Sequence, residues 1–148
     1  MNLPNTLEQL LMPEAEASPT YDRRLYDTIF AEVGGGPEEE VNAVTSVFMN
    51  RANKEGYERA LRGSSAYRKQ SKEYRKAKSG NLSAYEKKVY DRNKKLIDYL
   101  ANNPEEVSPY TFFENVNAFG DPIEKGLWPK EMKNWNKKDV GRQRFYWK

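Results

Sequence analysis

The chain contains no cysteine and no histidine, and this absence constrains the fold before any other feature. Without cysteine no disulfide can cross-link the chain, and without either residue the usual ligands of a structural zinc ion are missing. A chain of 148 residues must then be held by its own apolar core, and this length suffices for one domain. Only 37% of the residues are hydrophobic while 13% are aromatic, so we expect aromatic side chains to supply much of the core.

The same absence narrows the chemistry that the chain can perform. It excludes thiol nucleophiles, triads that use histidine as a base, and zinc sites built from cysteine and histidine. Carboxylates, hydroxyls, lysines and backbone amides remain, and we expect neither a metal nor another cofactor. The 25 basic and 22 acidic residues give a net charge of +3, a balance that argues against nucleic acid as the main partner.

The first 20 residues differ in composition from the rest. Pro4, Pro13 and Pro19 predict an extended arm over residues 1–20, followed by one domain over residues 21–148. The arm carries acidic residues instead of a basic stretch followed by an apolar one, so no secretion signal is visible. No apolar run approaches the roughly 20 residues that span a bilayer, so we expect no transmembrane segment.

Two helices are predicted around a run of three glycines. Apolar residues recur at helical spacing from Tyr21 onwards, and the glycines at 34–36 end this first helix. Pro37 opens a second helix that we expect to run to about Asn53, and the glutamates at 38–40 suit the positive end of its dipole. Its core-facing stripe consists of Val41, Val44, Val47 and Phe48.

Residues 56–80 interleave tyrosine with arginine and lysine, and we expect a short helix, a loop and a second short helix here. A solvated basic face explains this composition, and so does attraction to the acidic cell envelope. A groove for single-stranded nucleic acid is the third interpretation.

The remaining elements are a long helix and a small β element. Ser83 and Glu86 form a capping-box pattern that starts a helix running to about Ala101. We expect this helix to face the core with Tyr85, Val89, Leu96 and Leu100. Residues 110–113 and 140–147 are candidate strands. The chain is therefore predicted to be a mostly helical α+β domain with a small β element near the C-terminus.

Glu32 stands at the end of the first predicted helix, directly before the three glycines. A carboxyl group at the rim of an apolar core is partly desolvated, which raises its pKa. A general acid for glycoside cleavage needs this environment, because it must hold a proton near neutral pH and donate it to the leaving oxygen. An acid in the last turn of a helix is also an ordinary surface residue, and the spacing by itself does not decide between the two.

An aromatic segment in the last third has the chemistry of a sugar-binding site. Aromatic faces stack on sugar rings, while amides and carboxylates bind sugar hydroxyls. The candidate substrate-binding residues are Tyr110, Thr111, Phe113, Glu114, Asn115 and Trp128. The alternative is that these aromatic residues belong to the core.

Four segments, taken in order, resemble the cell-wall hydrolase family of the spore cortex-lytic enzymes, in the compact form found in bacteriophages. The segments are Glu32 with Gly35 and Pro37; Val47 to Arg51; Thr111, Phe113, Glu114 and Asn115 with Phe119, Gly120 and Trp128; and Gly141 with Phe145 and Tyr146. The resemblance covers about residues 24–147 and implies a lysozyme-like fold.

The resemblance also implies an activity and a catalytic residue. The family's members are lytic transglycosylases or muramidases that cleave the β-1,4 bond between N-acetylmuramic acid and N-acetylglucosamine in peptidoglycan glycan strands. The glutamate that opens the family motif is the catalytic acid, and it corresponds to Glu32. The family often has arginine where this chain has Gly34 and a second glutamate where it has Gly36, which puts substrate contacts nearby in question.

The number of carboxylates separates two mechanisms. Hydrolysis uses two carboxylates roughly 5 to 10 Å apart, whereas a lytic transglycosylase needs one, because a hydroxyl of the sugar itself attacks. The candidate second acids are Glu114, Asp121 and the glutamates at 38–40, the last being explained by the helix dipole. We favour the single-acid reaction, with Glu32 first as acid and then as base, and hydrolysis stays open.

Arg51 closes the second predicted helix. It is either a solvated helix end or a residue that buries its guanidinium against Glu32 or a C-terminal backbone carbonyl and so orders the site. The resemblance favours the second interpretation, and Arg51 is therefore counted among the substrate-binding candidates.

The resemblance and the missing secretion signal together suggest a bacteriophage protein that is associated with the virion or delivered to the bacterial cell envelope. Residues 1–20 would then contact virion or tail proteins. A hypothesis of a different class is a structural virion or tail component that keeps the fold without turnover, which the departures at Gly34 and Gly36 support. A nucleic-acid-binding module is the third hypothesis.

Overall fold

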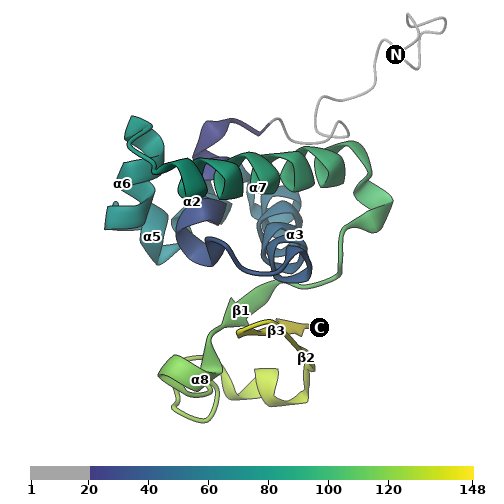
Figure 1. Ribbon diagram of the computed structural model, residues 1–148. Helices are drawn as coiled ribbons and strands as arrows, with labels where there is room; N and C mark the ends of the chain where they lie inside the picture. Colours follow the sequence, from purple (N-terminus) through teal and green to yellow (C-terminus); the bar gives the residue numbers. More distant parts are fainter. Residues whose placement is uncertain (1–20) are drawn as a thin grey trace, which may run out of the picture.

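The computed structural model describes residues 21–148, so the arm expected over residues 1–20 lies outside the described part of the chain. A helical body (residues 21–106) is followed by a smaller C-terminal lobe (residues 112–147), which contains a three-stranded antiparallel sheet (Figure 1). This arrangement confirms the predicted fold class of a mostly helical α+β domain with a small β element near the C-terminus.

The first two helices form where the sequence places them. Helix α2 (Arg23–Val33) ends because Gly34 adopts a φ of 55°, and its N–H closes the last turn on the Phe30 carbonyl at 2.9 Å. Helix α3 (Glu38–Glu55) begins after Pro37 and buries the whole of its predicted apolar stripe.

The basic segment folds into three short helices instead of the two expected. They are α4 (Tyr57–Arg62), α5 (Ser65–Arg68) and α6 (Lys72–Ser79). Ser64 and Ser71 start the last two, because each serine side chain accepts a hydrogen bond from the backbone N–H three residues later. The two serine caps therefore divide this segment into more helices than its composition predicts.

Helix α7 (Ala84–Asn102) begins with the predicted capping box of Ser83 and Glu86 and leads into the short 3-10 helix η2 (Pro104–Glu106). The expectation that Tyr85 faces the core is wrong, since its side chain is 69% exposed. Val89 and Leu100 are buried and Leu96 is half-buried, as the helical spacing predicts. Tyr85 lies in the first turn of the helix, beside a hollow in the surface that apolar periodicity cannot show.

The sheet has the order β1-β3-β2, with β1 (Phe112–Glu114), β2 (Asn136–Val140) and β3 (Gln143–Trp147). The candidate strand over 140–147 is wrong in its bounds, because this stretch holds the end of one strand, a turn and a second strand. Sequence reasoning missed β2 because this outer strand is almost entirely exposed and polar, so it carries no apolar pattern. Between β1 and β2 lie helix α8 (Val116–Phe119) and the 3-10 helix η3 (Lys130–Asn134).

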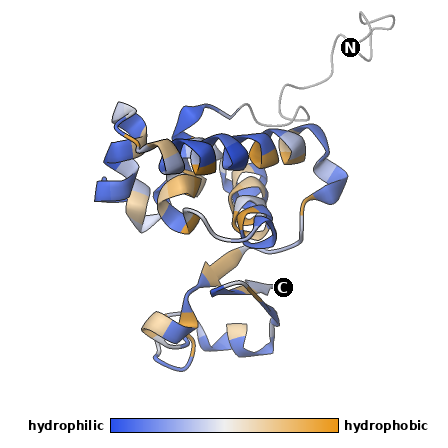
Figure 2. Cartoon of the chain, viewed as in Figure 1, coloured by the Kyte–Doolittle hydropathy of each residue, from blue (hydrophilic) through white to orange (hydrophobic). Residues whose placement is uncertain are grey.

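The main apolar core lies between α2, α3, α4, α7 and the inner face of the sheet. Figure 2 shows α7 alternating between hydrophilic and hydrophobic residues, as expected of an amphipathic helix that covers this core, and it shows β1 as hydrophobic. The C-terminal lobe has a small cluster of its own, formed by Ile123, Met132 and Tyr146. Two packed regions of unequal size therefore meet along the sheet.

Within the described residues, no helix combines the length and the apolar character that a membrane crossing requires.

Candidate active site

Glu32 occupies the last turn of α2, on the rim of the helical body. Its neighbours Phe30 and Val33 are buried, whereas the Glu32 side chain is half-buried. The helix therefore directs its apolar face into the core and leaves this carboxyl group at the boundary between core and solvent.

Helix α7 holds the glycine run after Glu32 in place. The Asn93 side chain donates a hydrogen bond to the Gly34 carbonyl at 3.1 Å, and the Arg92 guanidinium donates one to the Gly36 carbonyl at 2.7 Å. Asn93 is buried, so this contact is shielded from water. These two hydrogen bonds fix the loop that follows the candidate acid.

The surroundings of Glu32 favour its protonated form. Burial is the main cause, and together with the charge of Glu114 it raises the Glu32 pKa from 4.5 to about 7, against the opposing effect of a hydrogen bond from the Ser64 hydroxyl. Near neutral pH about half of the molecules then carry a proton on Glu32. This is the protonation behaviour expected of a general acid.

A cleft of about 720 Å³ runs past Glu32 between the helical body and the C-terminal lobe. It brings together six of the eight residues that the sequence analysis singled out: Glu32, Arg51, Phe113, Glu114, Asn115 and Trp128. The cleft also contains side chains from α3, α5, β1 and the loops around the sheet. Segments up to about 110 residues apart therefore contribute to one concave surface, which is the usual form of a ligand site.

Glu114 and Asn115 are fixed by the end of β1. The backbone N–H of Asn115 donates a hydrogen bond to the Glu114 carboxylate at 2.9 Å, and the Asn115 side chain accepts one from the backbone N–H of Ala118, which caps α8. Both side chains are half-buried and line the cleft.

Phe113 and Trp128 present aromatic surface to the cleft while packing on the sheet. The Phe113 ring lies 5.9 Å from that of Phe145, and the Trp128 ring meets the Tyr146 ring edge-on at 5.1 Å. Both side chains remain half-buried, so each is held rigidly and keeps part of its surface accessible. Rigid aromatic surface of this kind suits the apolar face of a sugar ring.

Tyr110 and Thr111 do not line the cleft, so their expected place at the substrate is wrong. Tyr110 is buried and packs on Phe145 and Trp147, with ring centroids 4.9 and 5.0 Å away. The Thr111 hydroxyl donates a hydrogen bond to the Tyr146 carbonyl at 3.2 Å. The two residues precede β1 and anchor its entry to β3, so the segment reaches the cleft only from Phe112 onwards.

Arg51 lies in the cleft but does not pair with Glu32. Its guanidinium contacts Glu55 at 3.2 Å, one helical turn further along α3, and lies 5.1 Å above the centre of the Phe112 ring. The predicted contact with Glu32 or a C-terminal carbonyl is therefore wrong. Arg51 forms part of the basic wall of the cleft instead.

Asp121 does not line the cleft either. Its carboxylate accepts hydrogen bonds from the Ile123 backbone N–H at 2.9 Å and from the Tyr146 hydroxyl at 3.4 Å, which stabilises the loop after α8. Of the candidate second acids, Glu114 alone shares the cleft with Glu32 among the residues described.

Glu40 has a role that the helix dipole does not explain. Glu38 and Glu39 are exposed in the first turn of α3, whereas Glu40 is completely buried. Its carboxylate accepts a hydrogen bond from the backbone N–H of Arg142 at 2.7 Å, in the turn between β2 and β3. A Cβ at Gly141 would lie 2.0 Å from the same carboxylate, so only glycine allows this approach.

The two departures from the family pattern have steric reasons in this structure. A Cβ on Gly36 would lie 2.9 Å from a Val33 methyl group and 3.1 Å from the Glu40 carboxylate, so a second glutamate does not fit there without a shift. Gly34 has a positive φ that disfavours the arginine of the family pattern. The conformation of the loop between α2 and α3 therefore requires glycine at both positions.

Several cleft residues were missed by sequence reasoning. They are Val47, Gly63, Ser65, Arg68, Phe112, Phe119, Arg142 and Gln143. Arg142 belongs to a turn that was expected to lie inside a strand, and its guanidinium reaches the Val33 carbonyl at 3.4 Å. Val47 and the exposed Phe119 do carry a sequence signal, since both stand in the segments that resemble the cell-wall hydrolase family.

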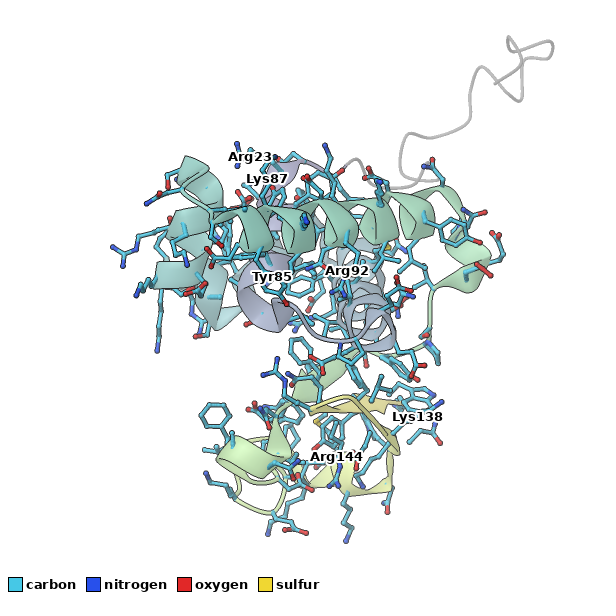
Figure 3. All side chains as sticks on the ribbon, in the orientation of Figure 1. Arg23, Tyr85, Lys87, Arg92, Lys138 and Arg144 are labelled. Atoms are coloured by element: carbon cyan, nitrogen blue, oxygen red, sulfur yellow. The ribbon has the colours of Figure 1, made fainter. Side chains whose placement is uncertain are left out.

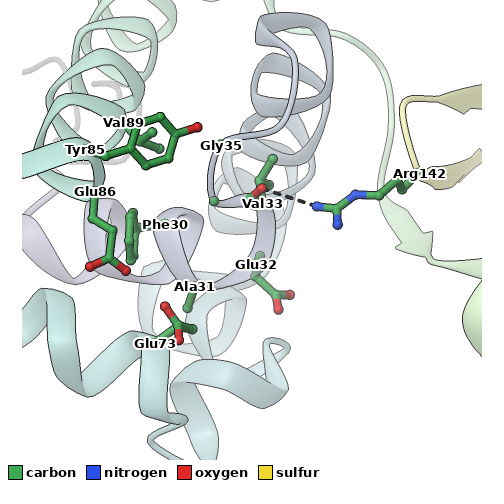
Figure 4. A pocket seen from close by; sticks show the side chains of 11 residues that line it. Phe30, Ala31, Glu32, Val33, Gly35, Glu73, Tyr85, Glu86, Val89 and Arg142 are labelled. Carbon is green, nitrogen blue, oxygen red and sulfur yellow. Dashed lines mark hydrogen bonds between the residues drawn. The ribbon is translucent and has the colours of Figure 1, made fainter. Parts of the chain in front are cut away.

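A second hollow of about 420 Å³ continues from Glu32 in the other direction, towards α7 (Figure 4). Glu32 and Arg142 line both hollows, so the cleft has two arms that meet at the candidate acid. We call the arm beside Phe113 and Trp128 the sheet arm and the arm beside Tyr85 the α7 arm. An elongated ligand can thus pass Glu32 instead of ending there.

The part of the chain that the structure describes has no cluster of three or more acidic residues suited to binding a metal ion.

Comparison of this chain with models of protein families, with curated proteins and with solved structures finds no match in any of the three.

Proposed function

We propose that this protein is a glycosidase that cleaves the β-1,4 bond between N-acetylmuramic acid and N-acetylglucosamine in peptidoglycan, with Glu32 as the catalytic acid. The observation that carries the proposal is a half-buried glutamic acid with a pKa of about 7 at the centre of a two-armed cleft. Aromatic, amide and arginine side chains line the cleft, and they offer the stacking surfaces and hydrogen-bond donors that a glycan requires.

The proposed chemistry begins with proton transfer. Protonated Glu32 donates its proton to the glycosidic oxygen, the bond from this oxygen to the anomeric carbon breaks, and positive charge develops on the sugar ring. The resulting Glu32 carboxylate then accepts a proton from the attacking group. In the transglycosylase reaction this group is the C6 hydroxyl of the same sugar, which yields a 1,6-anhydro product; in hydrolysis it is water.

Glu114 bears on the choice between the two reactions. It lines the same cleft as Glu32, and its charge contributes to raising the Glu32 pKa. A carboxylate in this place can stabilise the positively charged sugar ring or orient a water molecule. Hydrolysis with Glu114 as the second carboxylate is therefore an alternative to the single-acid reaction. The sequence alone could not show that Glu114 lies in the same cleft as Glu32.

Product analysis tests the proposal. Purified protein is incubated with cell-wall sacculi, and the soluble fragments are analysed by mass spectrometry. We expect muropeptides with 1,6-anhydro ends from transglycosylation or reducing ends from hydrolysis. Glu32→Gln should lower the rate by about 10²- to 10⁴-fold, because the glutamine cannot donate a proton.

A matched control separates loss of the acid from loss of the fold. Glu124 is exposed and lies outside both arms, so Glu124→Gln should leave the rate unchanged. Full activity of Glu32→Gln would remove Glu32 from the mechanism. No fragments from the unaltered protein would contradict the proposed activity itself.

A further inference from the structure

The α7 arm of the cleft contains an exposed aromatic residue that packing does not explain. Tyr85 is 69% exposed although apolar periodicity directs it to the core, and it lines the hollow next to Glu32. Figure 3 shows Tyr85 and Arg92 on the side of α7 turned towards the C-terminal lobe, whereas Lys87 lies on the opposite side. The ring is thus held on the cleft side of the helix.

Tyr85 lies over the glycine run. A Cβ on Gly35 would come within 2.9 Å of the Tyr85 hydroxyl, and Figure 4 shows the ring facing this glycine across the hollow. Gly35 does not have the positive φ of its neighbour Gly34, so backbone strain does not require glycine at this position. Its lack of a side chain allows the Tyr85 hydroxyl to lie close against the backbone, which positions the ring over the glycine run.

The acidic side chains of the α7 arm are engaged within the protein. Glu86 accepts the Ser83 backbone N–H and pairs with Lys76, and Glu73 lies 3.6 Å from the same lysine. Two carboxylates thus share one lysine, and this group keeps one net negative charge, which disfavours an anionic ligand in this arm. The groups left for a ligand are the Tyr85 ring and hydroxyl, the exposed backbone of Gly35, and Glu32 and Arg142 at the junction of the arms.

We propose that the α7 arm is a sugar-binding position on the side of Glu32 opposite to Phe113 and Trp128, with the Tyr85 ring as its stacking surface. The ligand is a neutral N-acetylated hexose of the same glycan, whose apolar face lies on Tyr85 while the chain continues through the sheet arm. This inference rests on the proposed function and assigns part of its substrate to a second site. A glycan bound in this way spans the acid, with sugars on both sides of the bond that breaks.

The experiment compares glycan fragments of alternating N-acetylglucosamine and N-acetylmuramic acid that are four, six and eight sugars long. Tyr85→Ala should raise KM for the longest fragment about three- to tenfold with a smaller change in kcat, because only one stacking contact is removed. It should also reduce the gain in kcat/KM on lengthening the fragment. Tyr85→Phe keeps the ring and should stay within twofold of the unaltered protein.

Tyr99→Ala is the matched control. Tyr99 is a tyrosine on the same helix, 53% exposed, and it lies outside both arms. Its replacement should leave KM and the length dependence unchanged. Circular dichroism on both alanine variants checks that the fold is intact.

Binding to the Glu32→Gln variant distinguishes the two proposals. If this variant binds the fragments and adding Tyr85→Ala changes neither affinity nor length dependence, the α7 arm is not a sugar site and the proposed function survives. If the unaltered protein neither cleaves nor binds any fragment, both proposals are overturned. Weaker binding on adding Tyr85→Ala, rescued by Tyr85→Phe, supports the assignment.

Discussion

At the scale of single residues, the environment of Glu32 sets the pH range in which this side chain holds a proton. The side chain is an ordinary glutamate, and its pKa near 7 arises from burial at the helix end and from the charge of Glu114. The Ser64 hydroxyl moderates the effect without reversing it. Three residues that are distant in sequence thus set one protonation equilibrium.

The activity of the protein should fall as the pH rises through about 7. Glu32 must carry its proton to act as the acid, and its pKa of about 7 means that the active form disappears above this pH. The measurement is kcat/KM on sacculi or soluble glycan between pH 5 and pH 9. A rate that stays constant to pH 9 would contradict the assignment of Glu32 as the acid.

Removal of the charge at Glu114 should lower the Glu32 pKa. Glu114→Gln abolishes the repulsion between the two carboxylates, so the alkaline limb of the pH profile should move to lower pH. If Glu114 also serves as the second carboxylate, kcat should fall at every pH. An unchanged profile would show that the two groups do not interact.

The stability of the fold should depend on Glu32 with a defined sign. The pKa in the folded state is about 7, above the ordinary value of 4.5, so folding retains a proton and stability decreases as the pH rises from 4.5 through 7. Glu32→Gln avoids a buried charge and should stabilise the protein at pH 8, by up to about 3 kcal/mol, and hardly at pH 4. Urea unfolding at the two pH values measures this difference, and equal stability changes at both would contradict it.

At the scale of elements, the turn between β2 and β3 is attached to the start of α3 by Glu40. The buried carboxylate accepts the Arg142 N–H, and Gly141 allows the close approach. The same turn carries the Arg142 side chain to Val33, the residue after the candidate acid. One buried contact therefore holds the C-terminal lobe in its position relative to α2.

Glu40→Ala should destabilise the protein by about 2 to 4 kcal/mol, because it removes a buried hydrogen bond and leaves a cavity in the core. It should also lower activity, since Arg142 and the sheet would lose their fixed position at the cleft. Thermal unfolding and the sacculus assay provide the two measurements. Glu39→Ala is the control, because this neighbour is exposed, and its effect should stay within about 0.5 kcal/mol.

At the scale of the whole molecule, the cleft exists because two packed regions of different size meet along a narrow sheet. The helical body supplies Glu32, Arg51 and the short basic helices, while the C-terminal lobe supplies Glu114 and the aromatic surface. Neither region contains the site alone. Ligand binding should therefore couple the two regions.

A glycan fragment should stabilise the Glu32→Gln variant against heat. At a concentration 100 times its Kd, a ligand of the folded state adds about 2.7 kcal/mol, which for a chain of this size raises Tm by several degrees. The shift should shrink when Trp128→Ala is added and persist when Tyr99→Ala is added. A shift that survives the loss of Trp128 would place the ligand outside the sheet arm.

The sequence alone determined the three longest helices and the position of Glu32 within them. Apolar spacing, the capping box of Ser83 and Glu86 and the glycines after Val33 are local signals, because each acts through residues within a few positions along the chain. They sufficed to predict α2, α3 and α7 and to place Glu32 on the rim of the core. The mixed aromatic and polar composition of residues 110–115 likewise indicated one wall of the cleft, although Tyr110 and Thr111 do not line it.

The tertiary structure alone decided which residues meet at Glu32 and which do not. Glu114 approaches it from about 80 positions away, Tyr85 points into a hollow, Glu40 is buried under a turn, and Tyr110 belongs to the core. Local spacing predicts a face of a helix or strand, but what that face contacts depends on the packing of segments far apart in the chain. Glu32 could therefore be singled out as a candidate from the sequence, whereas the cleft that surrounds it is a property of the folded molecule.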